Sequence, residues 1–483
     1  MSFSQAYFSG HHENLIGGWR HGSAAKVIEV GNPSTGEAFA TTSAATIEDC
    51  IAAVDAAAEA AAKWRATSPR ERAEILRRCY EMMIAEEDDL ARLISLENGK
   101  ALRDAIGEVR YAAEFFRWYG EETPRIIGNM SLAPSGQNHI LVTHEPVGIA
   151  VLVTPWNFPA AMATRKMAPA LAAGCTCVLK PATETPLTAL AVARIMIAAG
   201  VPEGAINVVV TERSGASVSA MLHDPRVRTV SFTGSTEVGR ILLKEAADQV
   251  LTTSMELGGN APFLVCADAD ITEALDGAMV AKMRNGGEAC TAANRFYVAR
   301  EVYDEFAKRL TDRMAALTVG EGEDPATELG PMVNAEAVDK IDELVQGAVA
   351  EGARVLTGGH KLNRPGHYYA PTVLADVPPT AEILKNEIFG PVAPLVAFDN
   401  EDEAVRLAND TEFGLISYVF TSDLRRGLDL SGKMESGMVA LNRGLASDPA
   451  APFGGTKASG LGREGSTDGI HEYLETKYIA TTL

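Results

Sequence analysis

The sequence predicts an α/β protein whose central unit is a parallel, Rossmann-like sheet with helices on both faces. Between residues 147 and 255, short apolar runs alternate with helical stretches. The runs are apolar almost throughout, as expected of strands that are covered on both faces. A second α/β unit starts after Gly258-Gly259 and continues the alternation to about residue 442. Alternation of this kind favours parallel sheets.

The segment before the sheet is expected to be strands and then helices. Residues 1–40 carry turn signals and should form short strands. Three helices should follow, the second opening with a capping box and a proline at its first position. They begin near Thr46, at Ser68-Pro69-Arg70-Glu71 and near Leu102, the third ending near Tyr119. Residues 125–146 are extended and polar-flanked, which indicates an arm that reaches a neighbouring subunit.

The two α/β units follow in order. Strands are expected at 147–154, 176–180, 206–210, 227–232 and 251–255, with helices at 160–173, 186–199, 214–222 and 237–248. The second unit begins with a strand at 262–266 and a helix capped by Asp270, followed by the Cys290 loop. Glycine-rich turns and a strand-like end occupy 460–483.

Charge and composition limit the possible partners. A net charge of −21 argues against nucleic-acid binding, which needs a basic face. An anionic substrate would have to be held by locally placed arginines. No apolar run reaches the length of a membrane span, and the residues after Met1 do not resemble a signal peptide. The cysteines form neither a disulfide framework nor zinc spacing, so we expect a cytoplasmic protein without a metal site.

Cys290 is the candidate nucleophile. It follows the flexible pair Gly286-Gly287 and precedes a strand-like run, so it can face a cleft at the strand entrance. Arg284 lies six residues upstream, and a nearby cation favours the thiolate. Most free cysteines, however, are small buried hydrophobes, so partners elsewhere in the chain have to support this role.

Two segments are candidates for cofactor binding. Thr233-Gly234-Ser235 lies at a strand–turn–helix junction, where a helix N-terminus favours a pyrophosphate. Lys180 lies at the end of another strand and can reach ribose hydroxyls or a 2′-phosphate. The alternatives are a tight turn and a solvated lysine.

Three further polar residues lie in suitable settings. Asn157 follows the first strand of the sheet in a proline-stiffened loop and offers a side-chain N–H to an oxyanion. Glu256 lies between an apolar strand end and a glycine turn, where partial burial would raise its pKa toward that of a general base. Glu387 is suited to hydrogen-bonding a ribose.

These motifs together resemble the aldehyde dehydrogenase superfamily over essentially the whole chain. They are Thr-Pro-Trp-Asn, Lys-Pro-Ala, Phe-Thr-Gly-Ser, Glu-Leu-Gly-Gly, the Cys290 loop, Glu-x-Phe-Gly-Pro and Pro452-Phe453-Gly454-Gly455. Within the superfamily the chain is most similar to the succinate-semialdehyde dehydrogenase group, notably in Ala163-Thr164-Arg165-Lys166 and Ser459-Gly460-Leu461-Gly462-Arg463-Glu464-Gly465.

The resemblance implies an aldehyde dehydrogenase-like fold and a set of roles. An NAD(P)-binding domain would comprise 1–125 and 147–256, a catalytic domain 257–445, and a small β oligomerisation element 126–146 and 460–483. Cys290 would be the nucleophile, Glu256 the deacylation base, and Asn157 with the Cys290 N–H the oxyanion hole. The cofactor, NAD or NADP, would contact Thr154, Pro155, Trp156, Asn157, Lys180, Ala182, Thr183, Glu184, Thr233, Gly234, Ser235, Leu257, Gly258, Glu387 and Phe389. Arg165, Arg284, Arg443 and Ser447 would bind a small anionic aldehyde.

Three departures from the group affect these expectations. Ala292 replaces a second cysteine, which excludes a redox disulfide with Cys290. Arg443 replaces a smaller or acidic residue and adds a cation at the substrate mouth. Thr183 replaces the glutamate of NAD-preferring relatives, which should admit NADP, although Glu184 is adjacent.

Several alternatives stay open at this level. The substrate is succinate semialdehyde or another acidic aldehyde, such as glutarate semialdehyde or the sulfonated three-carbon sulfolactaldehyde. A cysteine hydrolase would need a histidine paired with Cys290. The assembly is expected to be a homodimer or homotetramer.

Overall fold

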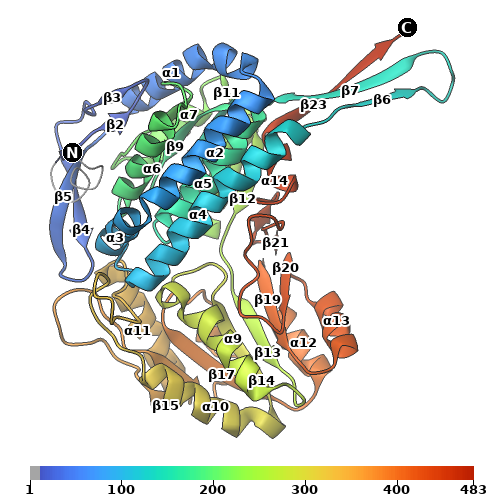
Figure 1. The fold of residues 1–483 in the computed structure, drawn as a ribbon. Helices are drawn as coiled ribbons and strands as arrows, with labels where there is room; N and C mark the ends of the chain where they lie inside the picture. The colour runs from blue at the N-terminus through green and yellow to red at the C-terminus, as the bar shows by residue number, and fades with distance from the viewer. Residues whose placement is uncertain (1–10, 483) are drawn as a thin grey trace.

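The computed structural model describes residues 11–482, and its largest sheet has eight strands (Figure 1). Their order is β22-β12-β11-β8-β9-β10-β2-β3. The bounds are Asn14–Leu15 (β2), Trp19–Arg20 (β3), Ile149–Val153 (β8), Thr176–Lys180 (β9), Ile206–Val208 (β10), Val227–Thr233 (β11), Thr252–Glu256 (β12) and Gly460–Leu461 (β22). The five central strands are parallel, which confirms the predicted sheet. The edges differ from the prediction, because short segments from near both chain ends add antiparallel strands there.

Helices cover both faces of this sheet. They are α1 (Ile47–Ala66), α2 (Pro69–Ala85), α3 (Glu87–Asn98), α4 (Leu102–Glu122), α5 (Pro159–Ala173), α6 (Pro186–Ala198), α7 (Ser214–Leu222), α8 (Thr236–Gln249) and the short α14 (Asp468–His471). Alternate residues of β8 enter different cores: Ala150 and Leu152 pack with α2 to α6, whereas Val151 packs with α1, α7 and α8. This explains why the strands are apolar throughout.

The helix starts agree with the sequence except in one place. Thr46 caps α1 in a reciprocal capping box with Asp49, and Ser68 accepts a hydrogen bond from the Glu71 N–H at the start of α2. Helix α3 was not predicted. It begins two residues after α2 ends, and its N-cap residue Glu86 makes no side-chain capping bond, so no capping motif marks its start and only its acidic first turn does.

The second α/β unit has a seven-stranded sheet in the order β15-β16-β17-β14-β13-β19-β20. All neighbouring strands are parallel except β15 and β16. The bounds are Ala261–Val265 (β13), Ala293–Ala299 (β14), Arg354–Thr357 (β15), Thr372–Ala375 (β16), Val392–Phe398 (β17), Ile416–Phe420 (β19) and Met438–Leu441 (β20). Its helices are α9 (Ile271–Met283), α10 (Arg300–Ala315), α11 (Ala335–Ala350), α12 (Glu401–Asn409) and α13 (Leu424–Lys433). Asp270 caps α9, as predicted.

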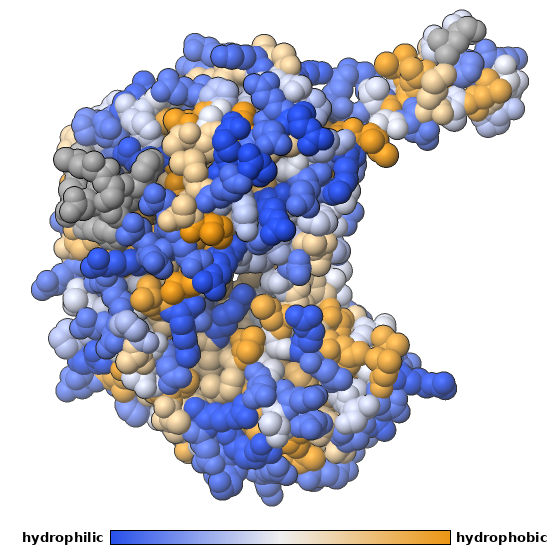
Figure 2. Space-filling model, in the orientation of Figure 1, coloured by the Kyte–Doolittle hydropathy of each residue, from blue (hydrophilic) through white to orange (hydrophobic). Residues whose placement is uncertain are grey.

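A three-stranded sheet projects from the body as an arm (Figure 1). It consists of β6 (Asn129–Leu132), β7 (His139–Pro146) and the C-terminal β23 (Leu474–Thr481), all antiparallel. Exposed apolar side chains of the arm include Met130, Leu132 and Ile479, and Figure 2 shows orange patches there among hydrophilic blue ones. The expected extended segment and strand-like tail are therefore confirmed, whereas contact with a neighbouring subunit stays a prediction.

The remaining strands lie outside these sheets. β1 (His11–His12), β4 (Val27–Asn32) and β5 (Glu37–Ser43) form a small sheet, and β18 (Phe413–Gly414) pairs with β21 (Thr456–Lys457). Within the described chain, no helix is both long enough and apolar enough to cross a bilayer. The segment after Met1, judged not to be a signal peptide, lies outside the described residues.

Candidate active site

A cavity of about 350 Å³ lies where the two α/β units meet, and Cys290 is in its wall. The loops after β8, β11 and β12 all reach it, because parallel strands end at the same edge of their sheet. Eleven of the predicted residues line it: Pro155, Trp156, Asn157, Thr233, Gly234, Ser235, Leu257, Gly258, Cys290, Glu387 and Phe389. The cavity is therefore lined by residues from both predicted domains, 147–256 and 257–445. The exact domain boundaries stay a prediction.

The loop before Cys290 has an unusual backbone. Asn285, Gly286 and Gly287 all have positive φ, at 52°, 60° and 81°. A Cβ on Gly287 would lie 2.3 Å from the Gly390 carbonyl oxygen, so only glycine fits there. Within residues 11–482 the Cys290 backbone N–H has no hydrogen-bond acceptor. It is therefore available to a ligand in the cavity.

The glycine turn after Glu256 also supports this loop. A Cβ on Gly259 would lie 2.3 Å from the Cys290 carbonyl oxygen, so the two loops approach more closely than a side chain would permit. The Gly259 N–H donates to Glu387 Oε1 at 3.3 Å. The Glu-Leu-Gly-Gly motif thus packs directly against the nucleophile loop.

Two arginines influence the Cys290 thiol, but burial dominates its pKa. Burial is the largest effect on it and raises its pKa to about 12, and the carboxyls of Glu387 and Glu256 also raise it. Arg165 and Arg284 both lower the pKa, but not enough to offset burial. The expectation that Arg284 would favour the thiolate is therefore confirmed in direction, but desolvation outweighs the two cations.

Asn157 presents its side-chain amide to the cavity from the loop after β8. Its Nδ2 donates one hydrogen to the Glu288 carbonyl oxygen at 3.1 Å, and its Oδ1 has no partner within the described chain. An amide nitrogen carries two hydrogens, so one remains. Asn157 and Cys290 both line the cavity, and each keeps an N–H without an acceptor in residues 11–482, so both are candidate donors for an oxyanion hole.

Glu256 is more deeply buried than expected. Its exposed fraction is 2%, and neither carboxylate oxygen has a hydrogen-bond partner within the described residues. Burial, followed by the neighbouring carboxyl of Glu464, raises its pKa well above the ordinary value, although Lys166, Arg165 and Arg463 lower it. The predicted direction of the pKa shift is confirmed. Glu256 does not itself line the cavity; its carboxylate lies against Gly454, whose Cβ position is 2.9 Å from Oε1.

The other end of the cavity suits a dinucleotide. Ser235 caps α8 by accepting from the Val238 N–H, so this helix N-terminus faces the cavity beside Gly234. Burial raises the pKa of Glu387 to about 7, and Lys340 lowers it. Lys340 lines the same cavity. Within residues 11–482 no cluster of three or more metal-ligating side chains is present.

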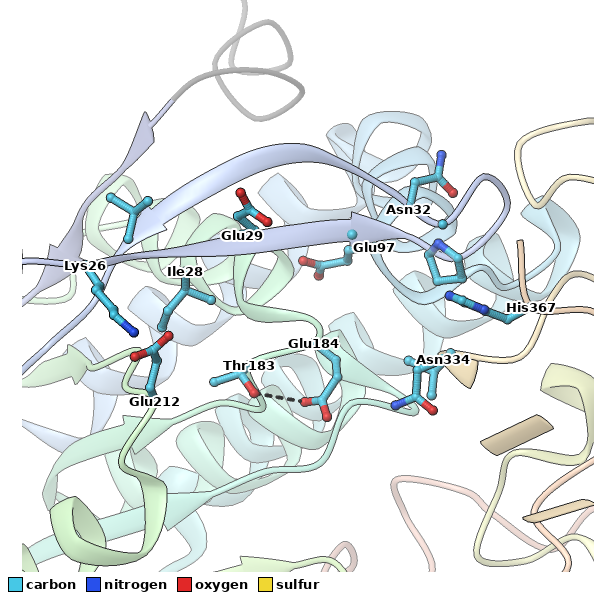
Figure 3. Close-up of a pocket in the computed structure, with 15 residues that line it drawn as sticks. Lys26, Ile28, Glu29, Asn32, Glu97, Thr183, Glu184, Glu212, Asn334 and His367 are labelled. Carbon is cyan, nitrogen blue, oxygen red and sulfur yellow. Dashed lines mark hydrogen bonds between the residues drawn. The ribbon is translucent and has the colours of Figure 1, made fainter. Parts of the chain in front are cut away.

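A second cavity of about 680 Å³ contains the remaining cofactor candidates Thr183 and Glu184 (Figure 3). The Thr183 hydroxyl donates to the Glu184 carboxylate at 3.3 Å. Burial lowers the pKa of Lys180 while Glu184 raises it, so a carboxylate lies beside this ammonium. Lys180, Ala182 and Thr154 are buried and line neither cavity. The two cavities meet at Val333 and Asn334, which line both.

Figure 3 also shows that this second cavity is acidic. The carboxylates of Glu29, Glu97, Glu184 and Glu212 surround it, with Lys26 and His367 as its basic side chains. The carboxylate of Glu97 is used to cap α6, since it accepts from the N–H groups of Leu187 and Thr188 at 2.9 Å each.

Two predicted substrate arginines lie near the thiol, but in different settings. Arg165 has an exposed fraction of 2%, lies 3.7 Å from Glu464, and bonds the Tyr111 hydroxyl. Arg284 is half-buried and lies 5.0 Å from the Phe158 ring centroid, with no ion pair in the described chain. Neither arginine lines the Cys290 cavity, and of the two only Arg284 has no ion pair within residues 11–482.

Arg443 and Ser447 are not brought to the Cys290 cavity. Both lie on the loop after β20, where Arg443 is exposed and Ser447 is half-buried, and neither lines the cavity. Their roles in substrate binding stay predictions.

Sequence reasoning missed several residues at the site. Phe158, Met162, Asn334, Glu336, Ala337, Lys340 and Ile388 line the cavity. Phe158 adjoins the Thr-Pro-Trp-Asn motif, so extending the motif by one residue would have included it. Lys340 is on α11, and a helical lysine in an acidic surface carries no local signal.

Comparisons with known proteins agree with this geometry. A model of the aldehyde dehydrogenase family matches residues 19–479. The chain is 54% identical to a succinate-semialdehyde dehydrogenase of Paenarthrobacter nicotinovorans, over 91% of this chain and 98% of the relative. It is 46% identical to the Escherichia coli succinate-semialdehyde dehydrogenase (NADP⁺) GabD, over 97% of each chain. An aldehyde dehydrogenase from Bacillus cereus, solved as an NAD⁺ complex, superposes with a TM-score of 0.97 at 33% identity, covering 100% of this chain and 99% of that one.

Proposed function

Because this chain belongs to the aldehyde dehydrogenase family, we propose that it oxidises a small anionic aldehyde to the carboxylic acid with NAD or NADP. Succinate semialdehyde is the substrate we favour. The observation that supports this most is that Cys290 and the amide donor Asn157 line one cavity, while Arg284, which has no ion pair within residues 11–482, is close enough to lower the Cys290 pKa.

The residues of the site divide the reaction into two steps. The Cys290 thiol loses its proton to water, and its sulfur adds to the aldehyde carbon, which forms a thiohemiacetal anion with the negative charge on the carbonyl oxygen. Asn157 Nδ2 and the Cys290 N–H are the donors for that oxygen. When bound, the nicotinamide of NAD(P) accepts the hydride that leaves the same carbon. The thioester that remains is hydrolysed by a water molecule whose proton Glu256 takes, and Glu256 then returns that proton to the leaving sulfur, so Cys290 is regenerated as a thiol.

The raised pKa of Glu256 suits its proposed role. A carboxylate that is buried without hydrogen-bond donors is a stronger base than an exposed one once it is ionised. Its effect on the Cys290 pKa places it within electrostatic reach of the thiol.

The residues present also fit a dinucleotide. The N-terminus of α8 offers free N–H groups to a pyrophosphate, and Glu387 offers an acceptor to a ribose hydroxyl. Lys180 and Glu184 would both lie beside the adenosine ribose of the cofactor. At position 183, threonine is smaller than the glutamate of NAD-preferring relatives and leaves room for a 2′-phosphate. Glu184 disfavours a 2′-phosphate, whereas Thr183 admits it, so both cofactors are candidates.

The site disfavours a cysteine hydrolase. The side chains that line the Cys290 cavity include no histidine from the described residues, so no general base of that type is paired with the thiol. We further propose that the chain acts as a homo-oligomer through the arm, and that it works in the cytoplasm, since all six cysteines are free.

The test is an assay of purified protein with a panel of aldehydes, each with NAD and with NADP. We expect kcat/KM for succinate semialdehyde to exceed that for butanal, a neutral aldehyde of equal chain length, by at least about tenfold. Glutarate semialdehyde and sulfolactaldehyde in the same panel rank the acidic alternatives. No change in nicotinamide absorbance with any aldehyde would overturn the proposal, and equal values for succinate semialdehyde and butanal would overturn its anionic part.

A further inference from the structure

The backbone oxygen of Asn157 is a buried acceptor held by two side chains from different segments. Lys100 Nζ donates to it at 2.8 Å, and Asn285 Nδ2 donates to it at 2.9 Å. Lys100 and Asn285 each have an exposed fraction of 3%. The peptide that carries the predicted oxyanion donor is therefore clamped from two sides.

Asn285 makes a second bond that ties this peptide to the nucleophile loop. Its Nδ2 also donates to the Glu288 carbonyl oxygen at 3.0 Å, and Asn157 Nδ2 donates to that same oxygen at 3.1 Å. Both hydrogens of the Asn285 amide are thus used. The shared acceptor belongs to Glu288, which lies two residues before Cys290. Asn157 Nδ2 uses one hydrogen in this bond and keeps the other free.

Both clamping residues are themselves fixed. Asn285 has φ of 52°, a conformation that asparagine tolerates better than most residues, and its N–H donates to Asp104 at 2.9 Å. Lys100 forms a buried ion pair with Glu108, whose other oxygen accepts from the Ala160 N–H at 2.9 Å at the start of α5. A buried pair with every polar atom bonded rigidifies its surroundings.

We propose that Asn285, assisted by Lys100, is a positioning residue that sets the distance and direction of the Asn157 N–H relative to Cys290. This inference rests on the proposed function, since it concerns the donor of that reaction. An oxyanion donor acts only if it is aimed at the place where charge develops, and a displacement of about 1 Å costs up to roughly 100-fold in rate. Asn285 does not line the cavity, and its side chain bonds the Asn157 and Glu288 carbonyl oxygens, so its proposed action is through Asn157.

The test compares Asn285→Gly with Asn285→Asp. Glycine retains the positive φ and removes both donors; aspartate keeps the shape and turns an oxygen toward two carbonyls. With succinate semialdehyde we expect both variants to lower the single-turnover rate of reduced-cofactor formation about 10- to 100-fold. We expect KM to change less than about threefold, since substrate binding by Arg284 is untouched.

A double-mutant cycle with Asn157→Ala separates this role from general support of the fold. If Asn285 acts through Asn157, Asn285→Gly should cost less than about threefold once Asn157 is alanine. An equal loss in both backgrounds, or no loss in the wild-type background, would overturn the inference. If Asn285→Gly fails to fold, the Asn285→Asp cycle decides in the same way, and Lys100→Met gives a third measurement.

Asn409→Gly is the matched control. Asn409 also bridges two backbone groups, donating to the Lys433 carbonyl at 2.8 Å and accepting from the Glu435 N–H at 2.9 Å, but it is half-buried and does not line the cavity. It should leave the single-turnover rate unchanged. An inactive wild-type protein would refute the proposed function, whereas an active wild type with unaffected Asn285 variants would refute only the positioning role.

Discussion

Replacing Arg284 by methionine should convert the protein from an enzyme for anionic aldehydes into one that no longer distinguishes charge. Arg284 is half-buried beside the Phe158 ring, and its guanidinium has no carboxylate partner within residues 11–482. Methionine keeps most of the packing against Phe158 and removes only the charge and the donors. Arg165 is a poorer choice, because its removal would also leave Glu464 with one cation fewer.

The magnitude follows from the kind of bond lost. A charge-assisted hydrogen bond contributes roughly 1.5–3 kcal/mol, and about 1.4 kcal/mol corresponds to tenfold. Arg284→Met should therefore lower kcat/KM for succinate semialdehyde about 10- to 100-fold. For butanal, which has no charge at that end, the change should stay within about threefold. Initial rates of reduced-cofactor formation measure both values.

Arg194→Met is the control for this experiment. Arg194 stacks on the Trp19 ring at 3.9 Å, so it is also an arginine on an aromatic face, but unlike Arg284 it is not among the charged groups that shift the Cys290 pKa. It should leave both substrates unaffected. Equal losses on succinate semialdehyde and butanal for Arg284→Met would refute the anion-binding role, as would a loss caused by Arg194→Met of the same size.

Three further outcomes are expected. Cys290→Ala should abolish oxidation, and steady turnover by this variant would contradict the nucleophile role. Glu256→Gln should still release about one equivalent of reduced cofactor per site in a stopped-flow burst, because hydride transfer precedes deacylation. Thr183→Glu should lower the NADP/NAD ratio of kcat/KM by about tenfold or more through like-charge repulsion, and an unchanged ratio would reject this position. In the cofactor-free protein, alkylation of Cys290 by iodoacetamide should be about 100-fold faster at pH 9 than at pH 7, because a thiol with a pKa of about 12 gains thiolate tenfold per pH unit over that range. A plateau below pH 9 would contradict this pKa.

Local patterns were sufficient to predict much of the fold. The apolar runs became the five parallel strands because burial on both faces removes the need for polar residues anywhere along them. Thr46, Ser68 and Asp270 cap their helices, as capping depends only on a side chain and N–H groups two or three residues away. Helix α3 was missed for the same reason, since it has no cap of this kind.

The sequence also determined which chemistry is possible. A thiol, an amide, a carboxylate and two arginines in recognisable motifs define the reacting groups, and the ends of parallel strands bring most of those motifs to one cavity. The motifs do not include the buried side chains that hold the motif residues in position. Lys100 and Asn285 lie 57 and 128 positions from the Asn157 oxygen that they hold, so no spacing rule relates them.

Only the tertiary structure decided the electrostatics of the site. The proximity of Arg284 to Cys290 in sequence was correct, yet the thiol pKa is raised, because burial by segments from both α/β units outweighs the cations. Similarly, Arg165 lies 3.7 Å from the carboxylate of Glu464, a residue near the end of the chain, which the sequence did not predict. The desolvation of a group depends on every atom that surrounds it, and those atoms come from segments that meet only in the folded molecule. A sequence motif identifies the group but not its surroundings, so it cannot predict the size of this effect on the pKa.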